Sequence, residues 1–254
     1  MKIRTYLSLT AAAVLVPVIV FATAALHMLL DAERKAALNA MQATARATAL
    51  SVDRELAAAE ARLRTLATSH YLLRGDLANF YNQSRETLNG DYAWILLSDR
   101  SGRQLFNTSA PYGEPLSRLA HPEPGAEAMR TGSIHVTNLR EGSAEKRPVV
   151  SVEVPLPHPD GLILSQSFVA EYFNRAFDRA AIPPDGVIGI IDRNGITVAR
   201  SRAGAQFVGK PTVPDLTAAA RRAEEGVVRT RSLDGVEIYG IYTHSKLSGW
   251  IVGI

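Results

Sequence analysis

The sequence VIGIIDRNGITVAR, residues 187–200, decides the fold. Apolar and β-branched residues at Val187–Asp192 and Thr197–Arg200 predict two short strands. Asp-Arg-Asn-Gly between them predicts a hairpin turn in which Gly195 supplies a positive φ. The stretch is therefore expected to form an antiparallel hairpin.

The same pattern occurs earlier in the chain, where Asp99-Arg100-Ser101-Gly102 follows another predicted strand. Three further matches follow in the same order. They pair Gly113-Glu114-Pro115 with Gly209-Lys210-Pro211, Ala128-Met129-Arg130-Thr131-Gly132 with Ala223-Glu224-Glu225-Gly226, and Gly161-Leu162-Ile163 with Gly249-Trp250-Ile251. Four matches in one order indicate an internal repeat.

Short β-branched and aromatic runs between turn residues predict two sets of five antiparallel strands. The first set is Ala93–Ser98, Gln104–Thr108, Ile134–Leu139, Val149–Val154 and Leu162–Phe168. The second set is Val187–Asp192, Thr197–Arg200, Gly226–Ser232, Glu237–Thr243 and Trp250–Ile254. Helices are expected at Glu171–Ala181, between the sets, and at Leu216–Glu225, within the second set.

The N-terminal segment predicts a membrane anchor. Residues 7–30 contain no charged side chain, and a helix of that length spans about 36 Å, against about 30 Å for the hydrocarbon core. Lys2 and Arg4 precede the segment while Asp31 and Glu33 follow it. The positive-inside rule therefore leaves the N-terminus in the cytoplasm and the remainder of the chain outside.

A cleavable signal peptide is the alternative, since Ala22-Thr23-Ala24 resembles a small-residue cleavage site. The apolar run is longer than a usual signal core, which favours the anchor. The absence of Cys suits an oxidising compartment. The expected location is the bacterial cytoplasmic membrane, with the folded region periplasmic or extracellular.

Residues 31–70 predict one long helix, since they lack Pro and Gly and are rich in good helix formers. Apolar residues recur on one face at helical spacing. They are Leu38, Met41, Val52, Leu56, Leu63 and Leu66, with Ala45, Ala49 and Ala59 between them. This seam packs either on the chain's own domain or, in its first half, on a second copy in a homodimer.

The anchor, the long helix and the two five-stranded units together resemble the double Cache sensor regions of bacterial histidine kinases and related receptors, whose modules are PAS-like. The second unit carries the more specific motifs: Ile190-Ile191-Asp192-Arg193-Asn194-Gly195, Ala199-Arg200-Ser201, Val208-Gly209, Glu225-Gly226, Leu233-Asp234-Gly235 and Ser248-Gly249-Trp250. The resemblance implies an α+β sensor region of a signal-transduction receptor. The receptor is expected to be a histidine kinase, with a chemoreceptor or diguanylate cyclase as alternatives. Its output domain would lie beyond Ile254.

The resemblance also implies a division of the chain. The expected regions are a cytoplasmic N-terminus (1–6), a transmembrane helix (7–30), a long helix (31–70), a membrane-distal module (71–182) and a membrane-proximal module (183–254). The distal module is expected to bind a small anionic or polar metabolite, because its segment Ser109–Ser133 offers Tyr112, Arg118 and His121 to cover a pocket, whereas the counterpart Ser201–Glu225 carries mostly small and charged residues.

Seven residues of the distal module are candidates for ligand contacts: Trp94, Tyr112, Arg118, His121, Ser151, Glu153 and Ser165. A guanidinium at Arg118 suits a carboxylate, while the alternative for Arg118 and His121 is a solvated loop, which the sequence favours. Trp94 lies in an apolar strand, where a tryptophan is more often part of the core than a ligand contact. The Arg-x-Trp-Tyr motif of amino-acid receptors is absent, so the resemblance does not imply an amino-acid ligand.

Other functions find little support. The net charge of +3 comes from 28 basic and 25 acidic residues without a basic block, which argues against nucleic acid. The six His residues lack metal-site spacing, no cofactor motif occurs, and neither a nucleophile elbow nor a phosphate-binding loop is present. Asp99 and Asp192 are explained as turn residues rather than an acid-base pair. A periplasmic protein-docking module and an anchored enzyme remain the competing hypotheses.

Overall fold

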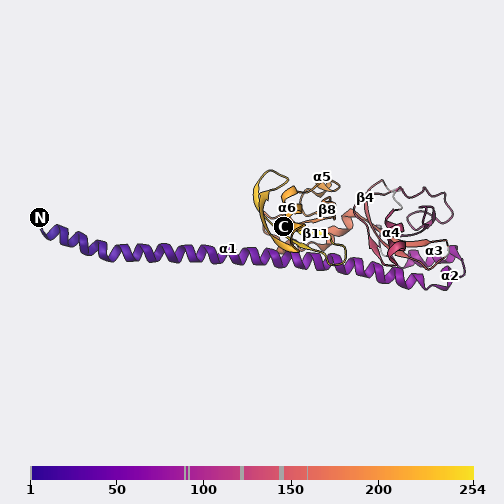
Figure 1. Cartoon of the computed structure of the whole chain (residues 1–254), viewed down its shortest axis with the longest axis horizontal. Coiled ribbons are helices and arrows are strands. Elements are labelled where there is room, and N and C mark those ends of the chain that lie inside the picture. Colours follow the sequence, from indigo (N-terminus) through magenta and orange to yellow (C-terminus); the bar gives the residue numbers. More distant parts are fainter. Residues whose placement is uncertain (1, 89, 91, 121–122, 143–145, 159) are drawn as a thin grey trace. The chain divides into compact units, whose positions relative to one another are not determined.

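The computed structural model describes residues 2–88, 90, 92–120, 123–142, 146–158 and 160–254. The chain divides into two compact units, residues 1–43 and residues 44–254. Helix α1 (Lys2–Ala67) begins in the first unit and ends in the second (Figure 1).

In the first unit the side chains from Leu15 to Ala37 are exposed. Between Leu15 and Leu30 the large hydrophobic side chains are each more than half exposed, and Phe21 reaches 76%. An 18-residue window of this helix has a mean hydropathy of 2.0. By length and composition the helix suffices to cross a membrane.

The part of α1 in the second unit lies beside both sheets (Figure 1) and forms one face of the main core. Seven of its residues are buried there: Ala45, Ala49, Val52, Leu56, Ala59, Leu63 and Leu66. Packing of the seam on the chain's own domain is therefore confirmed for this half. The dimer hypothesis is wrong for Ala45 and Val52, which are fully buried, while Leu38 and Met41 remain partly exposed.

The second unit contains two antiparallel sheets. The first sheet consists of β1 (Ala93–Asp99), β2 (Gln104–Asn107), β3 (His135–Val136), β4 (Arg140–Glu141), β5 (Pro148–Pro155) and β6 (Leu162–Val169). The second sheet consists of β7 (Gly189–Ile191), β8 (Thr197–Arg200), β9 (Glu225–Arg231), β10 (Glu237–His244) and β11 (Ile251–Gly253). Strand orders are β2-β1-β6-β5-β3, with β4 also on β5, and β8-β7-β11-β10-β9. With β4 set aside, both orders are 2-1-5-4-3, which confirms the internal repeat.

The repeated turns share their geometry. Gly102 and Gly195 have φ of 79° and 80°, and each closes a hairpin begun by an Asp. Positive φ also recurs in two further pairs, Gly113 with Gly209 and Gly161 with Gly249. Only glycine adopts these angles without strain, so the turns explain why the repeat is visible in the sequence.

Several helices differ from the prediction. The structure adds α2 (His70–Leu73), α3 (Leu77–Glu86), α4 (Glu123–Thr131) and α5 (Gly204–Phe207), and places α6 at Pro214–Ala220. The expected helix Glu171–Ala181 is not one continuous helix, since this segment forms two 3₁₀ pieces, η1 (Ala170–Ala176) and η2 (Arg179–Ala181). Phe173 and Phe177 both enter the core, and the extended backbone at Phe177 interrupts the helix.

Two other predicted elements were too long. The expected strand Ile134–Leu139 pairs only at β3, and the chain then leaves the ladder before β4. The expected helix Leu216–Glu225 starts earlier, with Pro214 at its first turn, and ends before β9 begins at Glu225. Proline suits a helix start because it has no backbone N–H to leave unpaired.

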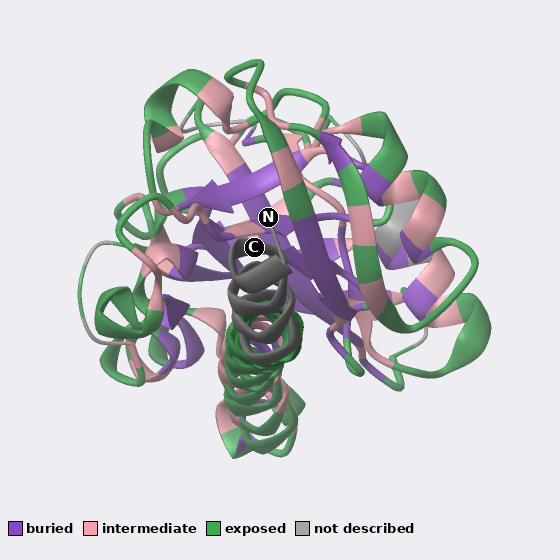
Figure 2. Ribbon diagram, turned by 90° about the vertical axis from the view of Figure 1, so that its left-hand side faces the viewer, coloured by how far each residue is buried: buried purple, intermediate pink, exposed green. Residues whose placement is uncertain are grey.

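Each sheet turns one face toward α1 and the other away from it. Buried residues concentrate in the strands of both sheets, while exposed residues lie mainly in the surrounding loops and helices and along β9 (Figure 2). On the second sheet the outer face is filled by apolar contacts between α6 and the strands, which involve Leu216, Ala220, Ile191, Tyr242 and Ile251. The outer face of the first sheet has a different composition.

Candidate ligand site

The outer face of the first sheet carries a buried polar row. Strand pairing places Ser165 of β6 between Leu96 of β1 and Glu153 of β5, and His135 of β3 pairs with Glu153. Side chains at alternate strand positions share a face, so Trp94, Ser167 and Ser151 form a second row beside it. We call this surface, with Ser98, the polar face.

The polar face is inaccessible to bulk solvent. Relative exposure is 0% for Ser151, 1% for Ser98, 2% for Ser165 and 3% for both Glu153 and Ser167. Buried polar groups are costly unless they are hydrogen-bonded. The corresponding face of the second sheet carries mainly apolar residues and glycine, so the two repeats differ where their architecture is the same.

Glu153 and Arg140 form the charged centre of the polar face. Nη2 of Arg140 donates to Glu153 Oε1 at 2.9 Å and to Ser151 Oγ at 3.0 Å, and Ser151 Oγ lies 2.7 Å from Ser167 Oγ. Burial raises the pKa of Glu153, and the nearby Arg140 opposes this shift. Glu153 Oε2 is buried and has no hydrogen-bond partner among the described residues.

Helix α4 covers the polar face closely because Gly125 lies at the contact. A Cβ at Gly125 would lie 2.4 Å from Cδ1 of Ile163 and 3.4 Å from Oε2 of Glu153. The unpartnered carboxylate oxygen therefore faces the backbone of α4. Glycine permits this approach, and any larger residue would displace Ile163 or the helix.

The segment 109–120 forms the other cover. Tyr81 Oη donates to Ala110 O at 2.8 Å, Gln104 Nε2 donates to Ser117 O at 2.7 Å, and Leu119 N donates to Gly102 O at 2.8 Å. The side chain of Leu119 packs on the apolar part of the polar face, against Trp94, Leu96, Val149 and Val169. The segment is thus tied at several points to the sheet that it covers.

Four of the seven predicted contact residues lie together on the polar face: Trp94, Ser151, Glu153 and Ser165. Tyr112 and Arg118 lie on the covering segment and are exposed, and the ring of Tyr112 packs on Tyr81 at 5.4 Å between centroids. His121 lies outside the described residues. Ligand contact by any of them stays a prediction.

The sequence reasoning missed four residues of this surface: Ser98, His135, Arg140 and Ser167. Period-two alternation carries a signal for Ser98 and Ser167, since each stands two positions from another residue of the face. Arg140 and His135 had no such signal, because their approach to Glu153 depends on how β3 and β4 pair with β5.

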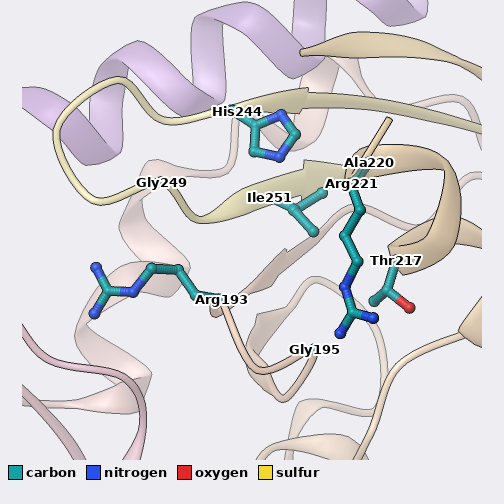
Figure 3. Close-up of a pocket in the computed structure, with 8 residues that line it drawn as sticks. All are labelled: Arg193, Gly195, Thr217, Ala220, Arg221, His244, Gly249 and Ile251. Carbon is teal, nitrogen blue, oxygen red and sulfur yellow. The ribbon is translucent and has the colours of Figure 1, made fainter. Parts of the chain in front are cut away.

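A separate pocket of about 190 Å³ lies on the second sheet (Figure 3). Its lining comprises Arg193, Gly195, Thr217, Ala220, Arg221, His244, Gly249 and Ile251. Arg221 extends toward Thr217, whereas the guanidinium of Arg193 points away from the other lining side chains (Figure 3). This pocket is smaller than the roughly 300 Å³ at which small-molecule sites begin.

The architecture of the chain has counterparts among solved structures of known proteins. No family model matches the chain, and no curated protein matches it. Solved structures do match. The ligand-binding domain of the Campylobacter jejuni chemoreceptor Tlp3, in complex with 4-methylisoleucine, has a TM-score of 0.63 at 15% identity, covering 87% of this chain and 90% of that chain. The chain has the fold of a receptor ligand-binding domain.

Two further structures agree. The ligand-binding domain of the Pseudomonas aeruginosa chemoreceptor PctC, in complex with GABA, gives a TM-score of 0.57 at 14% identity, covering 88% of this chain and 98% of that chain. The extracellular domain of the histidine kinase rpHK1S-Z16 gives 0.54 at 15% identity, covering 80% and 95%. The α+β fold expected from the double Cache resemblance is thereby confirmed, with β4 as an additional short strand.

Proposed function

We propose that the chain is the extracytoplasmic ligand-sensing region of a membrane-bound signal-transduction receptor, and that it binds a small metabolite at the polar face. One observation carries the proposal. Two repeats of one architecture differ on their outer faces. The first has buried hydroxyls and a carboxylate oxygen without a partner among the described residues, where the second is packed with apolar groups. Binding sites combine an apolar pocket with a few oriented polar groups.

The chemistry of the polar face indicates the kind of ligand. Arg140 already donates to Glu153 and Ser151, whereas Glu153 Oε2 is an acceptor in need of a donor. A ligand that brings an ammonium or N–H group would pair with this oxygen, and Trp94 would provide an apolar wall. Two of the structural neighbours are in complex with 4-methylisoleucine and GABA, both of which carry an amino group.

The membrane anchor is the second part of the proposal. Side chains between Leu15 and Leu30 are predominantly apolar and are exposed in the described structure, which suits lipid rather than water. Lys2 and Arg4 lie before this stretch, so residues from Asp31 onward lie outside the cytoplasm. An alkaline phosphatase fused after Ile254 should then be active, and an active cytoplasmic reporter at the same site would contradict the topology.

The receptor is proposed to act as a homodimer and without catalysis in this region. Leu38 and Met41 are partly exposed on the helix face that continues the buried seam, which suits a contact with the same helix of a second copy. In this view the buried pair of Glu153 and Arg140 serves recognition, with Oε1 of Glu153 held by Arg140 and Oε2 left to accept from the ligand.

A thermal-shift screen tests the ligand proposal. The full chain in detergent micelles is heated with a panel of primary amines, amino acids and carboxylates. A compound at a hundred times its Kd stabilises the fold by about 2.7 kcal/mol. We expect an amine-bearing compound to raise the Tm of the wild type, and Glu153→Gln and Ser165→Val to remove that shift.

Two control variants locate the site. Arg118→Ala tests the covering segment, and Arg221→Ala tests the pocket of the second sheet (Figure 3). We expect the Arg221→Ala chain to keep the full shift. A shift that survives both Glu153→Gln and Ser165→Val but is lost in Arg221→Ala would place the ligand on the second sheet and overturn the proposal.

A further inference from the structure

We propose that the turn Asp192-Arg193 is a coupling device that joins the ligand face of the first sheet to the second sheet through residues 136–140. The contacts that carry this inference need no ligand, although its meaning as a signal rests on the proposed function. The two Asp-x-x-Gly turns of the repeat provide an internal comparison, because one is self-contained and the other reaches across.

In the first copy the carboxylate of Asp99 is satisfied within its own hairpin. Oδ1 accepts from the backbone N–H groups of Ser101 at 2.9 Å and Arg103 at 3.1 Å, and Oδ2 accepts from Arg103 Nε at 3.0 Å. Burial alone would raise the pKa of Asp99, but these hydrogen bonds outweigh it and lower the pKa to about 2. Among the described residues, the hydrogen bonds and the ion pair of this carboxylate all stay within its own hairpin.

In the second copy the equivalent carboxylate, that of Asp192, accepts hydrogen bonds from two parts of the chain. Asp192 Oδ1 accepts from the N–H groups of Asn194 at 2.8 Å and Ile196 at 3.0 Å, as in the first turn. Ile196 stands where the first copy has Arg103, so it offers no side-chain donor. Asp192 Oδ2 instead accepts from Leu139 N at 2.9 Å, and the aspartate is fully buried.

Arg193 makes a second connection beside the first. Its Nη2 donates to Val136 O in β3 at 2.5 Å, and its Nη1 donates to Ser248 O in the turn before β11 at 2.8 Å. Arg100, at the equivalent position of the first copy, is exposed. Asp192 and Arg193 thus hold both ends of the segment 136–139 by its backbone.

The segment 136–140 also touches the ligand face. Arg140, next to Leu139, donates its side chain to Glu153 and Ser151, and Thr137 Oγ1 accepts from Ser151 N at 2.9 Å. A change in the partner of Glu153 therefore acts on Arg140. Arg140 follows Leu139, whose backbone N–H donates to Asp192, so the change also reaches that hydrogen bond. Coupling needs such a contiguous element, shared by both sites.

Two buried polar atoms, one in this segment and one on the polar face, lack a hydrogen-bond donor in the described structure. Asn138 Oδ1 and Glu153 Oε2 are both buried without a hydrogen-bond partner among the described residues. Unsatisfied buried polar groups are unfavourable, so a second arrangement that pairs them would be accessible. A ligand that supplies the donor for Glu153 would shift the balance between the two arrangements.

Hydrogen–deuterium exchange of the full chain in detergent micelles, without ligand, tests the coupling. Asp192→Asn keeps an oxygen that accepts from the turn but replaces Oδ2 with an NH₂ group. This group cannot accept from Leu139 N–H, so that hydrogen bond is lost. We expect exchange of residues 136–141 to become at least about tenfold faster, as for the loss of one charge-assisted hydrogen bond. Asp99→Asn makes the same change in the other copy and should leave residues 136–141 unaltered.

A second experiment changes the polar face and measures exchange at the Asp192 turn. It distinguishes coupling from a merely local effect of Asp192 on its neighbours, since coupling between two sites is reciprocal. Glu153→Gln should speed exchange at residues 192–196, across the junction. Arg193→Ala, with Arg100→Ala as its control, provides a second variant should Asp192→Asn not fold. Unchanged exchange of residues 136–141 in Arg193→Ala, or of residues 192–196 in Glu153→Gln, would overturn the proposal. Either result leaves ligand binding itself untouched, because that is measured by the thermal shift.

Discussion

At the scale of single residues, Glu153 decides how the polar face responds to its surroundings. Its side chain is almost fully buried, one oxygen is held by Arg140, and the other has no partner among the described residues. Burial raises the pKa of this carboxyl, with Arg140 acting in the opposite direction. The folded chain therefore binds the proton of Glu153 more tightly than the unfolded chain does.

The sign of the resulting pH dependence follows from linkage. A raised folded-state pKa stabilises the fold below the unfolded pKa of about 4.3, and this stability is lost as pH rises through the folded pKa. We predict that the Tm of the wild type falls, relative to Glu153→Gln, as pH rises from about 4.5. Thermal unfolding of both chains across this range measures the difference.

Glu127→Gln is the matched control for this measurement. The hydrogen bond from Arg130 lowers the pKa of Glu127, so its contribution has the opposite sign, and both partners are largely exposed. Its pH profile should stay close to that of the wild type because exposed pairs contribute little. Parallel profiles for Glu153→Gln and the wild type would contradict the account of Glu153.

At the scale of elements, the sequence predicted the strands well and the helices poorly. Strands such as β6 and β10 follow from β-branched and aromatic runs between turn residues, which are local signals. Helix α4 contains Pro124 and Gly125, residues that disfavour helix. It exists because it packs on β3 and β5, which no local pattern reveals.

The residues of the candidate site also fall into those with a local sequence signal and those that depend on tertiary structure. Ser151, Glu153 and Ser165 were predictable because a polar residue in an apolar strand stands out in the sequence. Arg140 was not, since its partner is 13 residues away and depends on the register of β4 against β5. The link from Leu139 to Asp192 spans 53 residues and joins two repeats, so only the fold reveals it.

One carboxylate of helix α1 holds the turn between β10 and β11 of the second sheet. Asp53 accepts hydrogen bonds from Ser245 Oγ, from Lys246 N at 3.0 Å and from Leu247 N at 3.2 Å. We predict that Asp53→Ala destabilises the full chain by about 1.5–3 kcal/mol, the usual range for hydrogen bonds to a charged group. Denaturant unfolding measures this change.

The control is Glu60→Ala on the same helix. Glu60 pairs with Arg64 one turn away, and the Arg64 side chain is 58% exposed. Such a pair contributes about 0.3–0.5 kcal/mol. Equal losses of stability in Asp53→Ala and Glu60→Ala would show that the turn at residues 245–247 does not depend on Asp53.

At the scale of the whole molecule, the two halves of the seam on α1 are proposed to have different partners. Val52 is fully buried in the chain's own core, whereas Leu38 and Met41 are partly exposed. We predict that cysteines at Leu38 and Met41 cross-link two copies in membranes, since tethering raises their effective concentration. A cysteine at Val52 should not.

A scan of single cysteines over residues 34–44 provides the pattern for this experiment. Cross-linking with helical periodicity, strongest at Leu38 and Met41, is expected of a parallel helix pair. Uniformly weak cross-linking along the scan, or cross-linking at Val52 equal to that at Leu38, would contradict a homodimer through this helix.

The central claim is that the outer face of the first sheet binds the ligand, and Trp94 reports on it directly. Trp94 lies on that face, while the only other tryptophan, Trp250, is buried in the main core. In a Trp250→Phe chain all tryptophan emission comes from Trp94. We predict that a compound that raises the Tm changes this emission in a saturable manner, and that Glu153→Gln removes the change. Emission that stays constant at concentrations that raise the Tm would contradict the account, because the ligand would then bind elsewhere.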